Sequence, residues 1–152
     1  MAKITIKEHL FQSCTAQVAG KYKTIQDNIK GIVASLEDAT KSSAGDKHET
    51  ARAMLQIDRE QAGERLAEIE KTLEVFYKIN ITSAPTHAHL GSLVTTNQGR
   101  FFLSISLGVL QHENVSFFCI GLQTPIGKVL LGKQEGDSFV FRDTTYTISS
   151  IS

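Results

Sequence analysis

Residues 18–36 read VAGKYKTIQDNIKGIVASL, and apolar residues return in this stretch at every third or fourth position. That spacing places them on one side of an α-helix and is typical of a seam that packs against a second helix. The first seam consists of Val18, Tyr22, Ile25, Ile29, Ile32 and Leu36. The sequence therefore predicts a long amphipathic helix in the first part of the chain.

A second seam follows a break at residues 41–45, and it consists of Leu55, Ala62, Leu66, Ile69, Leu73 and Phe76. Each helical stretch covers roughly 34 to 36 residues, which makes it about 50 Å long at 1.5 Å per residue. Two arms of equal length can pair as an antiparallel hairpin with its tip at 41–45. Pairing between two chains would use the same seams, but the break reads KSSAG, which favours a turn.

Charged residues accompany both seams with opposite signs. The first arm carries Lys3, Lys7, Lys21, Lys23 and Lys30, and the second carries Asp58, Glu60, Glu64, Glu68, Glu70 and Glu74. We expect these charges to flank the seams and favour antiparallel pairing. A plain solvated face is the alternative interpretation.

The composition changes near residue 84, after which charged residues become sparse and both prolines and most glycines occur. Val, Ile, Phe and Thr alternate there between turn residues, as in strands. We predict strands at 92–96, 101–107, 115–120, 138–141 and 145–151, the first three as an antiparallel meander. Thr124 and Pro125 are a predicted N-cap and first-turn proline of a short helix that ends near Gly132.

The predicted fold class is therefore α+β. Residues 1–82 form an antiparallel helical hairpin, a coiled coil, and residues 83–152 form a small antiparallel β domain with one short helix. The formal net charge of zero over 152 residues excludes an overall basic field, so we expect no independent DNA binding and no membrane attraction. The chain has no apolar run long enough to span a bilayer and no signal-peptide pattern, which predicts a cytoplasmic protein.

The predicted hairpin tip holds the residues with the clearest chemistry. Asp46 and Glu49 are three positions apart, which puts both carboxylates on one face of a helix, where they could share a divalent cation. Mg²⁺ normally needs further oxygen ligands, so another molecule would have to complete the site. A stand-alone enzyme is not expected. The same pair also resembles a capping box at a helix start, and the two interpretations are compatible.

Two other pairs of potential ligands are given structural interpretations. Cys14 and Cys119 are far apart in sequence, which favours buried thiols over a disulfide or a metal site. His87 and His89 could present two imidazoles on one side of an extended segment, but no third ligand is near in sequence. A polar linker is the preferred interpretation of that segment.

Three motifs resemble those of the Gre-type transcript cleavage factors, bacterial transcription elongation factors. Residues 45–51, GDKHETA, resemble the family's tip motif Gly-Asp-x-x-Glu-Asn-Ala. Residues 64–70, ERLAEIE, resemble its Arg-Ile-x-x-Ile-Glu stretch. Residues 124–133, TPIGKVLLGK, followed by Gly136-Asp137, resemble Ser-Pro-Ile-Gly-x-x-Leu-Leu-Gly-Lys and its later Gly-Asp. The resemblance covers most of the chain and implies an FKBP-like fold for residues 83–152.

The resemblance also implies a function. In that family the coiled-coil arm enters the secondary channel of RNA polymerase, where the tip carboxylates help hold a Mg²⁺ and orient the water that cuts backtracked RNA. Asp46 and Glu49 would take that role here, with the polymerase supplying the remaining ligands and the nascent RNA contacted indirectly. The loop with Gln123, Thr124 and Pro125 would then dock at the rim of the channel, although helix capping explains it equally well.

Several residues of the tip differ from the family motif. Thr50 replaces the Asn, Arg52 and Ala53 replace acidic and aromatic residues, and the pair at 47–48, Lys-His, adds positive charge beside the carboxylates. A cation there could pair with a carboxylate and weaken metal binding. The alternative function is therefore a noncatalytic or inhibitory coiled-coil protein whose tip carboxylates only cap the second helix.

Overall fold

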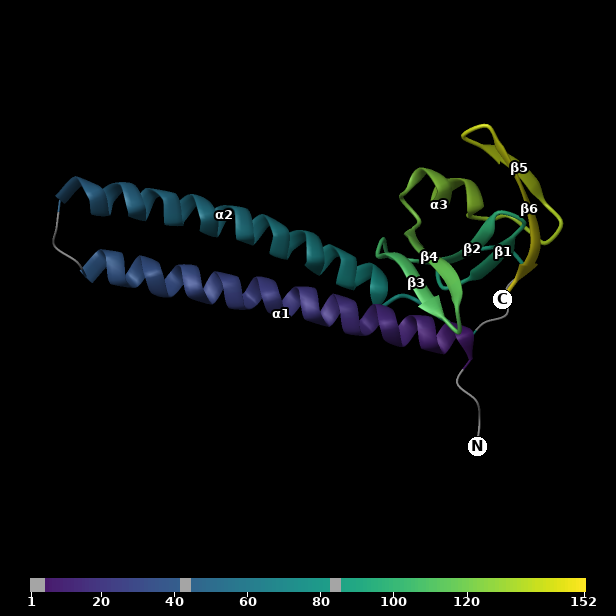
Figure 1. Ribbon diagram of the computed structural model, residues 1–152, viewed down its shortest axis with the longest axis horizontal. Helices are drawn as coiled ribbons and strands as arrows, with labels where there is room; N and C mark the ends of the chain where they lie inside the picture. Colours follow the sequence, from purple (N-terminus) through teal and green to yellow (C-terminus); the bar gives the residue numbers. More distant parts are fainter. Residues whose placement is uncertain (1–4, 42–44, 83–85) are drawn as a thin grey trace. The chain divides into compact units, whose positions relative to one another are not determined.

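The computed structural model describes residues 5–41, 45–82 and 86–152, with side chains left undescribed at 40–48. Two long helices, α1 (Ile6–Lys41) and α2 (Gly45–Phe76), precede a six-stranded sheet and one short helix, α3 (Pro125–Leu130) (Figure 1). The strands are β1 (Leu93–Thr96), β2 (Gly99–Ser104), β3 (Gly108–His112), β4 (Val115–Gly121), β5 (Ser138–Phe141) and β6 (Thr144–Ile151). The predicted α+β class is confirmed.

A reciprocal pair of hydrogen bonds fixes the start of α1. The Glu8 backbone N–H donates to Thr5 Oγ1 at 3.1 Å, and the Thr5 N–H donates to Glu8 Oε2 at 3.0 Å. This is a capping box, which satisfies two amide groups that the first helical turn leaves without partners. The first helix therefore begins well before the seam that predicted it.

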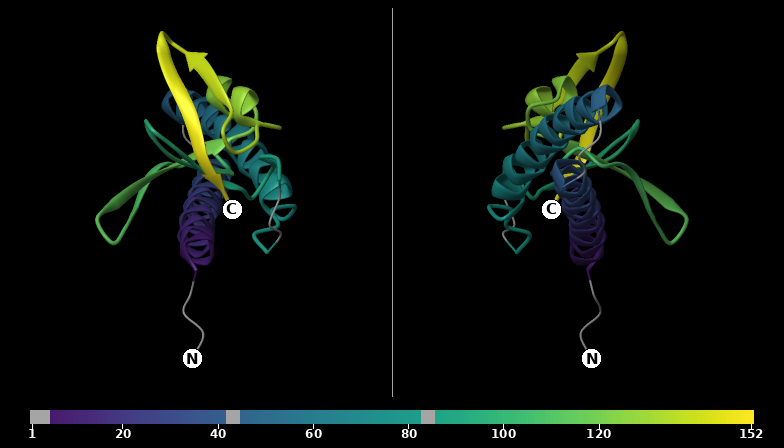
Figure 2. Two further views of the ribbon diagram at one scale, coloured as in Figure 1. Left: turned by 90° about the vertical axis from the view of Figure 1, so that its right-hand side faces the viewer. Right: turned by 90° about the vertical axis from the view of Figure 1, so that its left-hand side faces the viewer.

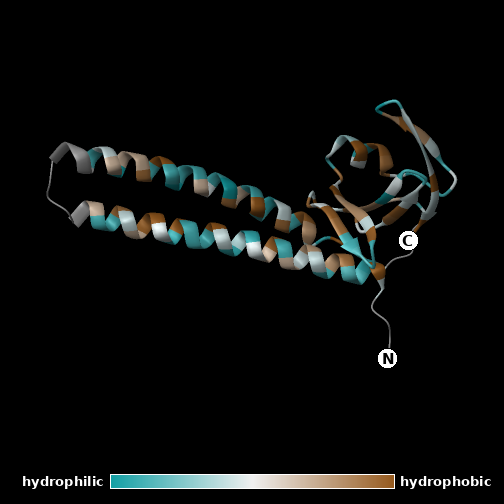
Figure 3. Cartoon of the chain, in the orientation of Figure 1, coloured by the Kyte–Doolittle hydropathy of each residue, from teal (hydrophilic) through white to brown (hydrophobic). Residues whose placement is uncertain are grey.

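Helices α1 and α2 run antiparallel and pack against each other, as Figures 1 and 2 show. Every seam residue is buried or half-buried, whereas most of the positions between them are exposed. Val18 and Ala62 are the most enclosed, and Figure 3 shows apolar positions recurring along both helices among hydrophilic ones. The predicted hairpin is confirmed. Residues 42–44 of its predicted tip lie outside the described residues.

The charges beside the seams are solvated. The named acidic residues of α2 and Lys21, Lys23 and Lys30 of α1 are all exposed. Among the described residues, no ion pair within 4.0 Å joins these two groups. Lys7 differs from the rest, because its side chain is buried and the desolvation lowers its pKa. Lys3 lies outside the described residues.

The sheet has the order β3-β4-β2-β1-β6-β5 and is mostly antiparallel. The predicted meander is wrong in one pairing: β2 and β4 are parallel, with Phe101 opposite Phe118. The stretch predicted as one strand at 101–107 ends at Ser104, and the chain then turns back through Gly108 (φ 82°) to form β3. Because β3 forms a hairpin with β4, the direction of β4 becomes that of β2.

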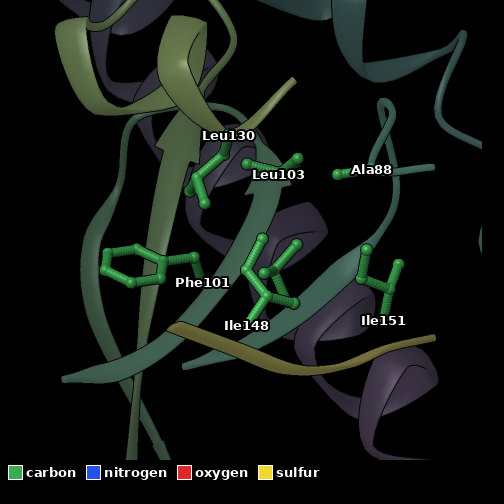
Figure 4. Packing of buried hydrophobic residues seen from close by; sticks show 7 residues of the cluster. Ala88, Phe101, Leu103, Leu130, Ile148 and Ile151 are labelled. Carbon is green, nitrogen blue, oxygen red and sulfur yellow. The ribbon is translucent and has the colours of Figure 1, made fainter. Parts of the chain in front are cut away.

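The main core lies on the face of the sheet that α3 covers. Leu130 of α3 points toward Leu103 and Phe101 of β2, and the side chains of Ile148 and Ile151 approach from β6 (Figure 4). Leu103 and Leu130 are fully buried. Residues on the other side of the sheet include Phe102 and its register partner Cys119. Burial of each such large apolar side chain contributes about 1.5 to 3 kcal/mol.

The chain divides into two compact units, one of residues 18–73 and the other of residues 1–17 and 74–152. The start of α1 and the end of α2 thus belong to the same unit as the sheet. In that unit Phe11 and Phe76 stack with ring centroids 4.8 Å apart. The sequence composition predicted a domain boundary at 82–83. The compact units instead divide the chain inside the two helices, after residue 17 of α1 and after residue 73 of α2. In the described residues no helix is both long enough and apolar enough to cross a membrane.

Candidate functional site

The predicted metal-binding carboxylates lie at the start of α2. That helix begins at Gly45, which makes Asp46 its second residue and Glu49 its fifth. Residues three apart on a helix share a face, so the described backbone supports the predicted placement. Glu49 is exposed, and the side chain of Asp46 lies outside the described residues.

The helix bounds also bear on the capping interpretation. An N-cap residue precedes the first helical residue and keeps a non-helical backbone. Asp46 already lies within α2, one position after its first residue. A hydrogen bond from a helix N–H to the Asp46 carboxylate would involve a side chain outside the described residues.

Carboxylate oxygens are the ligands that Mg²⁺ prefers, so Asp46 and Glu49 have suitable chemistry for it. In the part of the chain that the structure describes, no three His, Cys, Asp or Glu side chains group together as a metal site. The tip offers two carboxylate positions, residues 46 and 49 of α2. Arg52 is exposed one turn further along α2, and the side chains of residues 47 and 48 lie outside the described residues.

The predicted docking loop lies between β4 and α3. Thr124 is the N-cap of α3, with φ −70° and ψ 155°, and Pro125 occupies the first turn, as predicted. The Gly127 N–H donates to Thr124 Oγ1 at 3.1 Å, and Thr124 Oγ1 donates to the Gly121 carbonyl at 2.7 Å. Gln123 and Pro125 are exposed beside this network. Two hydrogen bonds thus hold Thr124, while its two neighbours are exposed to solvent.

Gly127 explains part of the TPIG motif in physical terms. A Cβ atom at this position would collide with the Gly121 carbonyl oxygen and would lie 2.9 Å from Thr124 Oγ1. The backbone of α3 therefore approaches the end of β4 more closely than any residue with a side chain allows. The capping interpretation of this loop is confirmed, and a docking role for its exposed residues stays a prediction.

The two histidines of the linker are held by separate partners. His87 contacts Gln134 through their side-chain nitrogens and forms an isolated β-bridge with it. His89 Nδ1 lies 2.8 Å from the Leu90 carbonyl oxygen, and Ser92 Oγ accepts from the His89 N–H at 3.0 Å. These contacts agree with the polar structural role that the sequence favoured for the segment.

Two features went unrecognised in the sequence. The first is an open cavity of about 520 Å³ between α1 and α2, lined by Ile29, Leu36, Gln56, Arg59, Glu60, Gly63 and Leu66. The sequence feature that corresponds to this cavity is Arg59, a polar residue between Leu55 and Ala62 at a position where the seam spacing predicts an apolar one.

The second feature is the approach of Cys14 to Cys119, both of which are buried and free as predicted. No local signal indicates that approach, because 105 positions separate the two residues.

No protein-family model matches the chain, and no curated protein matches it.

Proposed function

We propose that this chain is a Gre-like transcription elongation regulator that binds bacterial RNA polymerase through the polymerase's secondary channel. The observation that carries the proposal is the combination of an antiparallel hairpin, with arms of 36 and 32 residues, and a β-rich part with α3 at the TPIG motif. The family resemblance of three short motifs implies this same order of elements. A channel-binding arm must be long, and α1 spans about 54 Å at 1.5 Å per residue.

The tip carboxylates are the chemically active part of the proposed complex. Asp46 and Glu49 would hold a Mg²⁺ together with carboxylates of the polymerase and a phosphate of the RNA, and that ion would activate water for RNA hydrolysis. The exposed carboxylate of Glu49 supports this role, because an outward oxygen is available to a partner's metal ion. The protein itself acts as a cofactor for cleavage by the polymerase.

The loop before α3 supplies a second contact in this proposal. The network around Thr124 holds the backbone of the loop on which the exposed Gln123 and Pro125 lie. A preorganised loop loses little conformational entropy when it docks. Gln123 is the better residue to test, because its exposed side chain can be removed without disturbing the cap.

A noncatalytic regulator is the second candidate, and the charge at the tip favours it. Arg52 is exposed in the second turn of α2, and Lys47 and His48 stand between the two carboxylates in the sequence. Positive charge near a carboxylate competes with a metal ion for it. In that case the arm occupies the channel and inhibits or regulates the polymerase without cleaving RNA.

Cleavage of RNA in a stalled, backtracked polymerase from the same source separates the two candidates. The wild type is compared with Asp46→Asn and Glu49→Gln, which remove charge and keep the side-chain size. Asp58→Asn and Glu64→Gln are matched controls, because both residues are exposed carboxylates further along α2. The proposal expects cleavage with the wild type and both controls, and its loss in both tip variants while polymerase binding is retained.

Other outcomes have distinct meanings. Binding without cleavage by any variant supports the noncatalytic regulator, and absence of binding overturns the polymerase as partner. Gln123→Ala tests the docking loop in the same binding assay. Gln98→Ala is its control, because Gln98 is exposed in the turn between β1 and β2. Equal binding by these two variants would contradict a role for Gln123.

A further inference from the structure

Two thiols from distant parts of the chain meet inside the unit that contains the sheet. Cys14 lies on α1 and Cys119 on β4, and their Sγ atoms are 3.8 Å apart. Their exposed fractions are 0% and 1%, and both are free thiols. The sulfur atoms are therefore in direct contact, and a disulfide at about 2.05 Å requires them to approach by less than 2 Å.

A third polar group completes this buried cluster. Ser104 Oγ, on β2, is buried, and it has no conventional hydrogen-bond partner among the described residues. Ser104 lies on the same side of β2 as Phe102, whose register partner in β4 is Cys119. The hydroxyl interacts weakly with both thiols and acts to lower the pKa of each. The two cysteines thus lie beside a buried polar group.

We propose that Cys14 and Cys119 are a dithiol modification site, which a hydroperoxide oxidises to an intramolecular disulfide. The inference is independent of the proposed function in transcription. The reaction consumes two thiols and one hydroperoxide, ROOH, and yields one disulfide, one alcohol, ROH, and one water. With hydrogen peroxide both oxygen products are water.

The reaction proceeds in two steps, and the contact between the two sulfur atoms lets either thiol act first. In the first step the thiolate of one cysteine attacks the peroxide oxygen and breaks the O–O bond, and the proton that this thiol gave up ends on the alkoxide as ROH. In the second step the sulfur of the other cysteine attacks the resulting sulfenic acid, and its proton leaves with the sulfenic oxygen as water.

The bond would join the first part of α1 to β4, the strand beside the edge strand β3. In the unfolded chain it would close a loop of more than a hundred residues, since 105 positions separate the cysteines. Restricting so long a loop favours the folded state by up to about 3 × 10³-fold, before any strain in the bond is subtracted. Because both thiols are buried, the peroxide reaches them when the contact between α1 and β4 opens locally.

The first test treats the folded full-length protein with hydrogen peroxide and maps its cysteines by mass spectrometry. The expected product has lost two hydrogen atoms and yields a cross-linked pair of peptides that contain Cys14 and Cys119. Cys119→Ala is the control, and its Cys14 is expected to stop at the sulfenic or a higher acid. A wild type that gives only such acids, or that stays reduced while folded, would overturn the proposal.

A second test measures the equilibrium instead of the rate, so that burial of the thiols does not limit it. The wild type is equilibrated with mixtures of reduced and oxidised dithiothreitol, once under native conditions and once in concentrated urea. The proposal expects the disulfide to be favoured at least tenfold more in the folded protein, with about 3 × 10³-fold as the upper bound. A ratio below tenfold would show that the folded geometry does not support the bond.

Discussion

Replacement of Gly127 by alanine tests the account of the TPIG motif most sharply. The new methyl group would collide with the Gly121 carbonyl oxygen and would lie 3.1 Å from the Gly121 carbonyl carbon. Both are backbone atoms that cannot rotate away, so α3 must shift. Overpacking of this kind costs about 1 to 3 kcal/mol, and disturbance of the Thr124 cap adds about 1 kcal/mol. The higher helix propensity of alanine offsets up to about 1 kcal/mol of this destabilisation.

The net expectation for Gly127→Ala is a loss of about 2 kcal/mol in the free energy of unfolding. Gly31→Ala is the matched control, because Gly31 is also helical but its added Cβ meets no atom within 4 Å. At that position only the higher helix propensity of alanine changes the stability, and it should stabilise the protein by up to about 1 kcal/mol.

Urea unfolding followed by circular dichroism measures both changes, and calorimetry tells which of the two compact units is affected. The two substitutions are expected to have opposite signs. A Gly127→Ala protein as stable as the wild type would refute the close approach of α3 to β4.

Three further substitutions test local features by the same unfolding measurement. Thr124→Ala removes the N-cap oxygen and is expected to cost about 1 kcal/mol, whereas Thr124→Ser keeps that oxygen and should lose much less. Ser104→Ala removes a buried hydroxyl without a conventional partner, so stability should stay the same or rise; a loss above about 1 kcal/mol would show that its contact with the thiols is stabilising. Burial lowers the pKa of Lys7 below its ordinary 10.5. At pH values between the lowered pKa of the folded protein and 10.5, the unfolded chain therefore binds more protons than the folded one. Stability should therefore rise with pH in that window, and Lys7→Met should abolish the rise; an unchanged rise would assign it to another group.

Local patterns predicted the elements whose stability is decided by nearby residues. The seams indicated both helices because burial follows the three-and-four spacing, and α2 keeps that spacing down to Phe76. Thr124 and Pro125 predicted the start of α3 because an N-cap depends on residues within one turn. The turn between β5 and β6, at Arg142 and Asp143, both with positive φ, depends on local residues in the same way.

Features that depend on distant partners were not predicted. The parallel pairing of β2 and β4 follows from the position of β3 beside β4. The residues of β2 and β4 do not by themselves indicate which strand lies next to them. The burial of Lys7 and the meeting of Cys14 with Cys119 depend likewise on packing between distant segments. For the candidate site, spacing predicted a shared helical face for Asp46 and Glu49, while their function depends on a partner molecule.

The central claim is that the tip of the hairpin enters the secondary channel of RNA polymerase. Photo-cross-linking tests it directly, with a benzophenone side chain at Arg52, an exposed position near the start of α2. A second protein with the same group at Ser150, exposed on β6, is the control. The account predicts cross-links from position 52 to polymerase residues that line the channel, and none of these from position 150. Cross-links from position 52 to another polymerase surface, or to no part of the polymerase, would contradict it.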